Sequence, residues 1–274
     1  MARFSANGAE FEYETVGAGE PLVLIHGSII GNAFGPLLKE SALTSRYQVT
    51  NYQRRGFAPS SRHNGPFSVA QQAADAAAVI RHVAGGHAHV AGHSYGAATA
   101  LQLALDVPGA VQCLALLEPP MPVPSAEAFF ANLPPVEALY TAGDRAGAVD
   151  AFLNLAIGAG YRPAVDRSLG PGWFERAVED IDAFFQVEIP ALGEWQFTEE
   201  LARRITQPAL AVLGADSPEF FIEGYELLQR WLPRVETFVL PGATHGLQMQ
   251  NARGMAEGLA GFLARHPMPA KVLA

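Results

Sequence analysis

Residues 92–96 read Gly92-His93-Ser94-Tyr95-Gly96 and match the pattern G-x-S-x-G. A short apolar run over 88–91 precedes them, and a helical pattern over Tyr95–Asp106 follows. So sharp a strand-to-helix turn strains the serine and exposes its hydroxyl, and flanking side chains would clash there. With 11 serines and 27 glycines, chance gives roughly 0.1 such matches per chain. The motif predicts that Ser94 is a nucleophile.

Short apolar runs alternate with helical patterns on both sides of this motif. This alternation predicts right-handed crossovers and a parallel sheet covered on both faces. The expected strands are Ala9–Val16, Pro21–Ile25, Tyr47–Tyr52, 88–91, Val111–Leu117, Pro208–Gly214 and Val235–Leu240. The expected helices are Ala33–Ser45, Ser68–Val83 with Ser68 as its N-cap, Tyr95–Asp106, Glu219–Leu232 and Ala252–Arg265.

Between residues 119 and 205 the sequence shows only helical patterns broken by glycine and proline. Both ends of this insertion enter the same sheet, so it is interpreted as a lid and not as an independent domain. We therefore expect a core made of residues 1–118 and 206–274 and a helical cap made of residues 119–205. Eleven aromatic residues in the insertion favour an apolar pocket beneath it.

The chain resembles the α/β-hydrolase family in this elbow motif and in His26-Gly27, which follows the run PLVLI as the family's "HG" oxyanion loop does. The resemblance implies a mostly parallel eight-stranded sheet with helices on both faces and a helical lid inserted after the sixth strand. It also implies that the backbone N–H groups of Ser28 and Tyr95 stabilise an oxyanion. Residues 52–56 (YQRRG) resemble the family's Y-D-R-R-G turn, with Gln53 in place of Asp, and are expected to be structural.

A serine hydroxyl needs an adjacent base to act at neutral pH. His245 follows the last predicted strand, in the sequence PGATHG, where the family carries its catalytic histidine. His245 is therefore predicted to be the general base. His26, Ile29 and His93 lie beside the oxyanion loop and the elbow, and we expect them to line the substrate pocket.

The carboxylate that orients the base has two candidates. The family usually places it after the seventh strand in the pattern G-x-x-D, but here Ser217 holds that position and Asp216 comes one residue early. Glu118 ends the apolar sixth strand, where haloalkane dehalogenases and certain lactone hydrolases of the family carry their acid. A lone carboxylate at the end of a buried strand needs a partner. Glu118 is the favoured acid, and Asp216 is the alternative.

Composition narrows the class of protein. The formal net charge of −9 and the scattered Lys and Arg residues argue against nucleic-acid binding. One cysteine, Cys113, excludes an intrachain disulfide and a zinc site built on several cysteines. His87, His89 and His93 cluster in sequence without a nearby carboxylate, so we expect no metal and no cofactor. The sequence has no signal-peptide run at residues 1–8 and no membrane-spanning stretch, so a cytoplasmic protein is expected.

These residues predict a serine hydrolase that opens a carboxylic ester or lactone of a small, largely apolar substrate through an acyl-enzyme on Ser94. Two enzyme alternatives use the same triad, a C–C bond hydrolase and an acyltransferase. A non-catalytic small-ligand receptor of this fold is the alternative from another class. A small molecule is the expected partner, and the sequence is compatible with a homodimer.

Overall fold

The centre of the molecule, seen in a computed structural model that describes residues 1–62 and 65–269, is an eight-stranded sheet of order β1-β2-β4-β3-β5-β6-β7-β8. β1 pairs antiparallel with β2 and β2 with β4, and every other pairing is parallel. The strands are β1 Ala2–Ala6, β2 Ala9–Val16, β3 Glu20–Ile25, β4 Tyr47–Tyr52, β5 Ala88–His93, β6 Val111–Leu117, β7 Ala209–Gly214 and β8 Val235–Leu240. The predicted mostly parallel eight-stranded sheet is confirmed.

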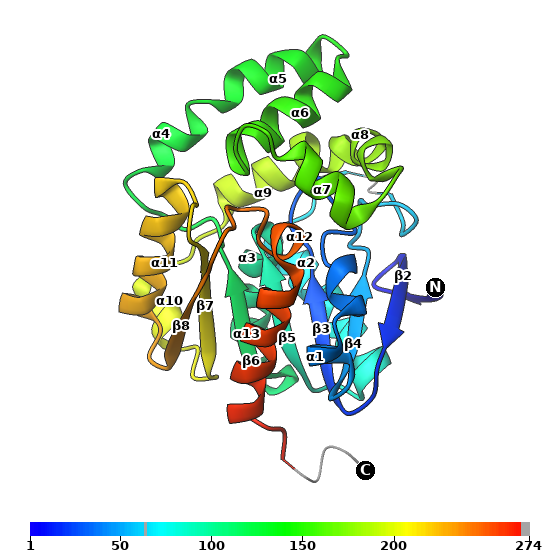
Figure 1. Ribbon diagram of the computed structural model, residues 1–274, viewed down its shortest axis with the longest axis vertical. Helices are drawn as coiled ribbons and strands as arrows, with labels where there is room; N and C mark the ends of the chain where they lie inside the picture. The colour runs from blue at the N-terminus through cyan, green and yellow to red at the C-terminus, as the bar shows by residue number, and fades with distance from the viewer. Residues whose placement is uncertain (63–64, 270–274) are drawn as a thin grey trace.

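Both faces of the sheet are buried under helices. Along β3, Val23 and Ile25 join one apolar cluster, whereas Leu22 and Leu24 join the cluster on the opposite face. This division explains why the strand is an unbroken apolar run. One face is covered by α2 (Val69–Ala84), α3 (Tyr95–Asp106) and α11 (Glu219–Trp231), and the other by α1 (Ser41–Thr44) and α13 (Ala252–Arg265) (Figure 1).

The segment between β6 and β7 is helical, and all but its last helix forms a layer above the sheet (Figure 1). Its helices are α4 Ala126–Phe130, α5 Leu133–Thr141, α6 Arg145–Ala156, α7 Arg162–Leu169, α8 Trp173–Ala183, a π-helical turn Phe184–Glu188, α9 Ile189–Glu194 and α10 Glu199–Arg203. The layer has its own apolar cluster, which also takes in Ile29 and Ile30 from the loop after β3. Phe197, Ala202 and Ile205, at the end of the predicted cap, pack instead in the core cluster beneath α11.

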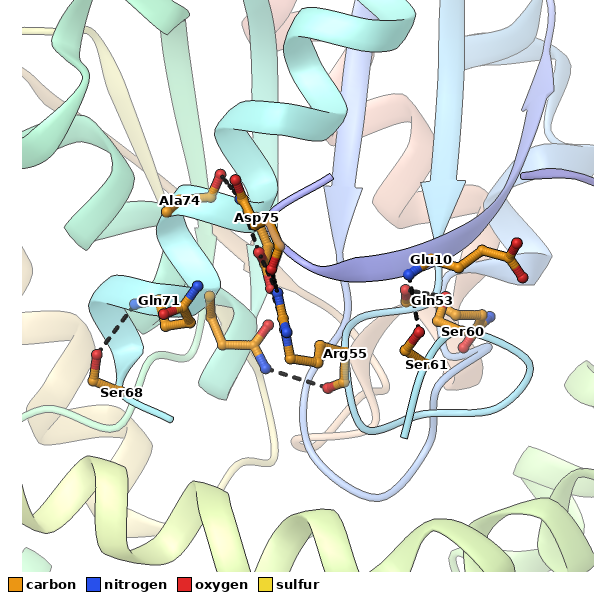
Figure 2. A network of polar contacts seen from close by, with 11 residues as sticks. Glu10, Gln53, Arg55, Ser60, Ser61, Ser68, Gln71, Ala74 and Asp75 are labelled. Atoms are coloured by element: carbon orange, nitrogen blue, oxygen red, sulfur yellow. Dashed lines mark hydrogen bonds and ion pairs between the residues drawn. The ribbon is translucent and has the colours of Figure 1, made fainter. Parts of the chain in front are cut away.

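The loop after β4 is tied to two elements of the core. Arg55 donates two hydrogen bonds to the carboxylate of Asp75 on α2, at 2.8 and 2.9 Å, and Ser61 accepts the backbone N–H of Glu10 on β2 (Figure 2). Ser68 caps α2, and its hydroxyl accepts the Gln71 backbone N–H at 3.1 Å, as predicted (Figure 2). These bonds fix the turn at residues 53–56, which contacts the site described next.

Two elements differ from the expectation. The first strand, Ala2–Ala6, was not predicted, because it is an edge strand that is exposed along most of its length and has no apolar alternation. The predicted helix over Ala33–Ser45 is wrong as a single element: a 3₁₀ turn, Gly35–Lys39, and the short helix α1 stand on either side of Glu40, whose backbone is extended. Pro36 favours the start of the first turn, and the extended Glu40 separates the two pieces.

Candidate active site

Ser94 lies at the turn between β5 and α3, with φ 54° and ψ −122°. This conformation is costly for a residue with a side chain and persists only where the surroundings impose it. The Ser94 backbone N–H donates to the carbonyl of Leu117 at the end of β6, at 2.8 Å. A Cβ atom on Gly92 would lie 2.3 Å from the Gly96 carbonyl oxygen, and one on Gly96 would lie 2.1 Å from the Ile25 carbonyl oxygen. The clash that the sequence motif implied is therefore a clash with backbone.

Gly96→Ala is expected to destabilise the protein by about 3 kcal/mol or more, because rigid backbone carbonyls meet the added methyl group. For a chain of this size, that loss lowers Tm by roughly 6 to 12 °C. Gly193→Ala is the matched control, because Gly193 is exposed in α9 and an added Cβ meets nothing within 4 Å. The control is expected to melt at or slightly above the wild-type temperature. Equal melting of both variants in calorimetry would contradict this account.

His245 lies in the loop after β8 and is bound to the end of β6. Its Nδ1–H donates to Oε2 of Glu118 at 2.6 Å. Both side chains are buried, Glu118 at 1% exposure and His245 at 6%. A carboxylate accepts only, so this bond fixes the proton on Nδ1 and leaves Nε2 with a free lone pair. That lone pair is what a general base needs.

Two further groups fix the Glu118 carboxylate. Its Oε1 atom accepts the Gly214 backbone N–H at 2.7 Å and the Ser217 hydroxyl at 2.5 Å. The Glu118 backbone has φ 47°, a left-handed conformation that is uncommon outside glycine. This conformation turns the chain at the end of β6, so the side chain lies across the ends of β7 and of the loop that carries His245. Both carboxylate oxygens are thus used, which stabilises a buried charge.

Asp216, the alternative acid, lies elsewhere. Its side chain is exposed, and among the described residues the carboxylate that His245 binds is that of Glu118. Ser217, the residue at the family's usual acid position, supports Glu118 instead. At the position where the family usually has its acid, this chain therefore has a hydroxyl that donates to a carboxylate on the neighbouring strand.

Two neighbours hold the His245 ring and backbone. The ring stacks on Phe221 of α11, with centroids 3.8 Å apart and planes at 8°. The His245 carbonyl accepts the Nε2–H of His93 at 2.9 Å, and Gln248 donates to His93 Nδ1 at 3.3 Å. Phe221 and Gln248 were not predicted from the sequence, because their contacts depend on packing between distant segments.

The loop after β3 lies against the elbow. A Cβ atom on Gly27 would lie 3.0 Å from the Cβ atom of Ser94, so only glycine allows this approach without displacement. Ser28, the next residue, lines the same two cavities as Ser94 and His245. Tyr95 begins α3, where the first backbone N–H groups have no acceptor within the helix. The two predicted oxyanion donors thus lie on the two segments that meet at Ser94.

Two adjoining cavities meet at Ser94, Ser28 and His245. The first is also lined by Ile30, His93 and Met249, with a volume of about 20 Å³, and the second by Phe129, Phe130, Phe184 and Phe221, with about 30 Å³. Such volumes hold water but no substrate, so cap side chains must move before a substrate reaches Ser94. Four of the eleven cap aromatics line these cavities: Phe129, Phe130, Phe152 and Phe184.

Two of the predicted pocket residues do not line the cavities. Ile29 is buried in the apolar cluster of the cap, and the adjacent Ile30 takes its place at the first cavity. His26 is fully buried, and its Nδ1–H donates to the Gly27 carbonyl while Nε2 accepts the Arg54 backbone N–H. His93 lines the first cavity. Burial lowers the pKa of His26 and of His93 well below the usual value, so both rings are neutral.

A second chain of nucleophile, imidazole and carboxylate crosses the sheet away from the elbow. Cys113 Sγ lies 2.9 Å from His89 Nδ1, and His89 Nε2 donates to Glu20 at 2.9 Å. The sequence suggested no carboxylate near His89, and this expectation is wrong, because the fold places Glu20 beside it. The thiol is fully buried, and burial raises its pKa, which keeps it protonated and unreactive. This cluster is structural.

Other kinds of site receive no support from the residues that the structure describes. Over residues 1–62 and 65–269, no group of three or more His, Cys, Asp and Glu side chains is placed to hold a metal ion. Over the same residues, no helix has both the length and the apolar character needed to cross a bilayer.

The model of the family described as "Alpha/beta hydrolase family" matches residues 22–257. A relative from Azorhizobium caulinodans, named "Putative carbamate hydrolase RutD", is 38% identical over 109 residues. That match covers 40% of this chain and 41% of the relative, so it spans about two fifths of the relative's length.

Two other similarities extend over nearly the whole chain. The non-heme haloperoxidase of Rhodococcus erythropolis is 28% identical over 272 residues, covering 94% of this chain and 97% of the relative. The solved structure of a thermophilic esterase from Thermogutta terrifontis superposes with a TM-score of 0.81 at 20% identity, covering 97% and 100% of the two chains. At that identity the esterase supports the fold alone.

Proposed function

The chain belongs to the alpha/beta hydrolase family, and from this we propose that it is a serine hydrolase that cleaves the ester or lactone bond of a small, uncharged, largely apolar substrate. The observation that carries the proposal is the chain of contacts from Glu118 to His245 at the wall of the cavities that Ser94 lines. This arrangement supplies a nucleophile, a base with its acceptor nitrogen free, and a buried carboxylate that stabilises the protonated base.

The proposed reaction has two halves. His245 Nε2 takes the Ser94 proton as the hydroxyl oxygen attacks the substrate carbonyl carbon, and the resulting oxyanion accepts hydrogen bonds from the backbone N–H groups of Ser28 and Tyr95. His245 then donates the proton to the leaving alkoxide, which leaves an ester on Ser94. Water, deprotonated by His245, then attacks the carbonyl carbon of that ester. The bond to the Ser94 oxygen breaks, the acid is released, and His245 returns the proton to the Ser94 oxygen, which restores the free enzyme. No hydrogen bond joins Ser94 and His245 in the described structure, so we propose that this contact forms with substrate bound.

The preference for an uncharged substrate rests on the cavity walls. Within the described residues, no Asp, Glu, Lys or Arg lines either cavity at Ser94. A larger cavity of about 240 Å³ shares Pro120, Phe130 and Leu192 with the second of them and adds Met121 and Trp195. These shared residues separate Ser94 from a space large enough for an apolar substituent. Movement of the cap side chains would join the spaces.

Nitrophenyl butyrate and mono-nitrophenyl glutarate test this proposal, because both are small esters but only the glutarate carries a free, ionised carboxylate. The butyrate is expected to be turned over many times per molecule of protein. The glutarate is expected to have a kcat/KM lower by about 100-fold or more, because its charge would be buried without a cation. Initial rates at several enzyme concentrations measure both.

Stoichiometric binding of the butyrate without turnover would contradict hydrolase activity and favour a ligand receptor. Equal kcat/KM values for the two esters would contradict the assignment of an uncharged substrate but leave the hydrolase assignment intact. An aromatic lactone, measured in the same way, distinguishes a lactonase from an esterase by the ratio of the two kcat/KM values.

A further inference from the structure

Arg54 is a fully buried arginine beneath the oxyanion loop, at 0% exposure. Its Nε–H donates to the His26 carbonyl at 2.9 Å, and its Nη2–H donates to the Gly27 carbonyl at 2.9 Å. Its backbone N–H also donates to His26 Nε2 at 3.0 Å. One residue therefore holds three acceptors of the segment that leads into Ser28, the proposed oxyanion donor.

The guanidinium has its counter-charge in the cap. Nη2 also donates to Oε1 of Glu188, which is 1% exposed and ends the π-helical turn Phe184–Glu188. The guanidinium lies 4.8 Å from the ring centroids of Phe57 and of Tyr95, the residue that begins α3. A cap carboxylate, the oxyanion loop and the elbow helix thus meet at a single side chain.

The ion pair between Arg54 and Glu188 is not well arranged to stabilise the fold. Within the described residues, Arg54 Nη1 and Glu188 Oε2 have no hydrogen-bond partner although both are buried. A buried ion pair with unsatisfied atoms is commonly no more stabilising than apolar residues of similar volume. π-helical turns, such as the one that presents Glu188, frequently occur at functional sites.

The turn that carries Arg54 is anchored on its other side. Arg55, the next residue, is fixed by the two hydrogen bonds to Asp75 on α2 (Figure 2). The backbone of the turn therefore cannot follow a displaced guanidinium freely. A change at Glu188 is transmitted mainly through the Arg54 side chain to the His26 and Gly27 carbonyls.

We propose that Glu188 is a positioning residue for the oxyanion hole: through Arg54 it holds the His26–Gly27 backbone, and so the Ser28 N–H, in place when the cap is closed. The inference rests on the proposed hydrolase function. When the cap moves to admit substrate, Arg54 loses its counter-charge, and the oxyanion donor is held fully only after the cap closes again. The cap would then control transition-state stabilisation as well as access.

Glu188→Gln and Asp180→Asn form a matched pair for the test. Asp180, on α8 of the cap, pairs with Arg62 of the core and accepts the Ala58 backbone N–H, so it is also a buried cap-to-core contact, but it does not touch the oxyanion loop. Glu188→Gln is expected to lower kcat by about 30-fold with KM changed less than threefold. Loss of a whole oxyanion donor lowers kcat by about 10²- to 10³-fold, and a displaced donor should cost less. Asp180→Asn is expected to keep both kcat and KM within twofold of the wild-type values.

Two readouts separate positioning from a general loss of stability. The inhibition constant of a trifluoromethyl ketone, which forms an oxyanion on Ser94, should rise in Glu188→Gln by the same factor as kcat falls. Hydrogen exchange of the backbone amides of residues 26–30 should be faster in Glu188→Gln than in wild type and Asp180→Asn. Glu188→Asp keeps the charge but shortens the side chain, so a smaller loss of kcat and of inhibitor affinity is expected. This variant replaces Glu188→Gln in the test if Glu188→Gln does not fold.

Equal losses in Glu188→Gln and Asp180→Asn would overturn the proposal, since any weakening of the cap would then suffice. An unchanged trifluoromethyl ketone affinity in Glu188→Gln and Glu188→Asp would do the same. If wild type hydrolyses no ester, the proposed function fails, and the exchange of residues 26–30 still decides whether Glu188 holds the loop. Unchanged exchange in both Glu188 variants would then refute the coupling itself.

Discussion

Ser94→Ala is expected to lower kcat/KM for nitrophenyl butyrate by about 10⁵-fold or more, which corresponds to about 7 kcal/mol in the activation barrier. Without the hydroxyl, no covalent intermediate forms, and only the oxyanion donors and substrate binding remain to accelerate attack by water. The folded structure should be unaffected, because the Ser94 backbone N–H still donates to Leu117 and no hydrogen bond of the described structure uses the hydroxyl. Initial rates and Tm measure the two effects.

Ser45→Ala is the control for this change, because Ser45 is an exposed serine that lines neither cavity, and its hydroxyl donates to the Ser41 carbonyl. It should retain wild-type activity. A fluorophosphonate should label wild type and Ser45→Ala once per chain, at Ser94, and should not label Ser94→Ala. Residual activity in Ser94→Ala within about tenfold of wild type would mean that another group is the nucleophile.

Much of the fold was predictable, because short apolar or alternating runs mark most of its strands. The bounds of β2, β4, β6 and β8 agree with the sequence-based prediction, since each is a short run with turn residues on either side. β1 was not predicted, because its residues are mostly exposed and form no apolar pattern. The pair Asn7-Gly8, with φ 50° and 73°, is the hairpin signal that would have revealed it.

The site was predictable only where a motif carries it. The turn at Ser94 depends on local glycines, and these can be recognised in sequence. The contact between Arg54 and Glu188 joins residues 134 positions apart, and no local pattern indicates it. Ile29 was expected in the pocket but points into the cap cluster, because its backbone adopts φ 66° and breaks the alternation that a strand would give. Long-range packing and left-handed backbone are the features that sequence alone did not reveal.

The assignment of Glu118, and not Asp216, as the acid predicts a large loss of kcat when Glu118 is changed. Glu118→Gln is expected to lower kcat by about 10³- to 10⁴-fold, because the amide can donate to Nδ1 and so favours the wrong tautomer of His245, and because the imidazolium formed during attack loses its buried counter-charge. The Gly214 N–H and Ser217 hydroxyl would still find an oxygen acceptor, so Tm should fall by only a few degrees.

Asp216→Asn provides the contrast, since it makes the same chemical change at an exposed carboxylate one residue from Ser217. It should leave kcat and KM within about twofold of wild type, as surface substitutions usually do. Ser217→Ala should fall between the two, because it removes one of the two donors to Glu118 Oε1 without touching His245. If Asp216→Asn proved more damaging than Glu118→Gln, the loop after β7 would have to rearrange when substrate binds, and the acid would be the one at the family's usual strand. The order Glu118→Gln, then Ser217→Ala, then Asp216→Asn would show instead that the acid sits on β6 and that the β7 position has kept only a supporting hydroxyl.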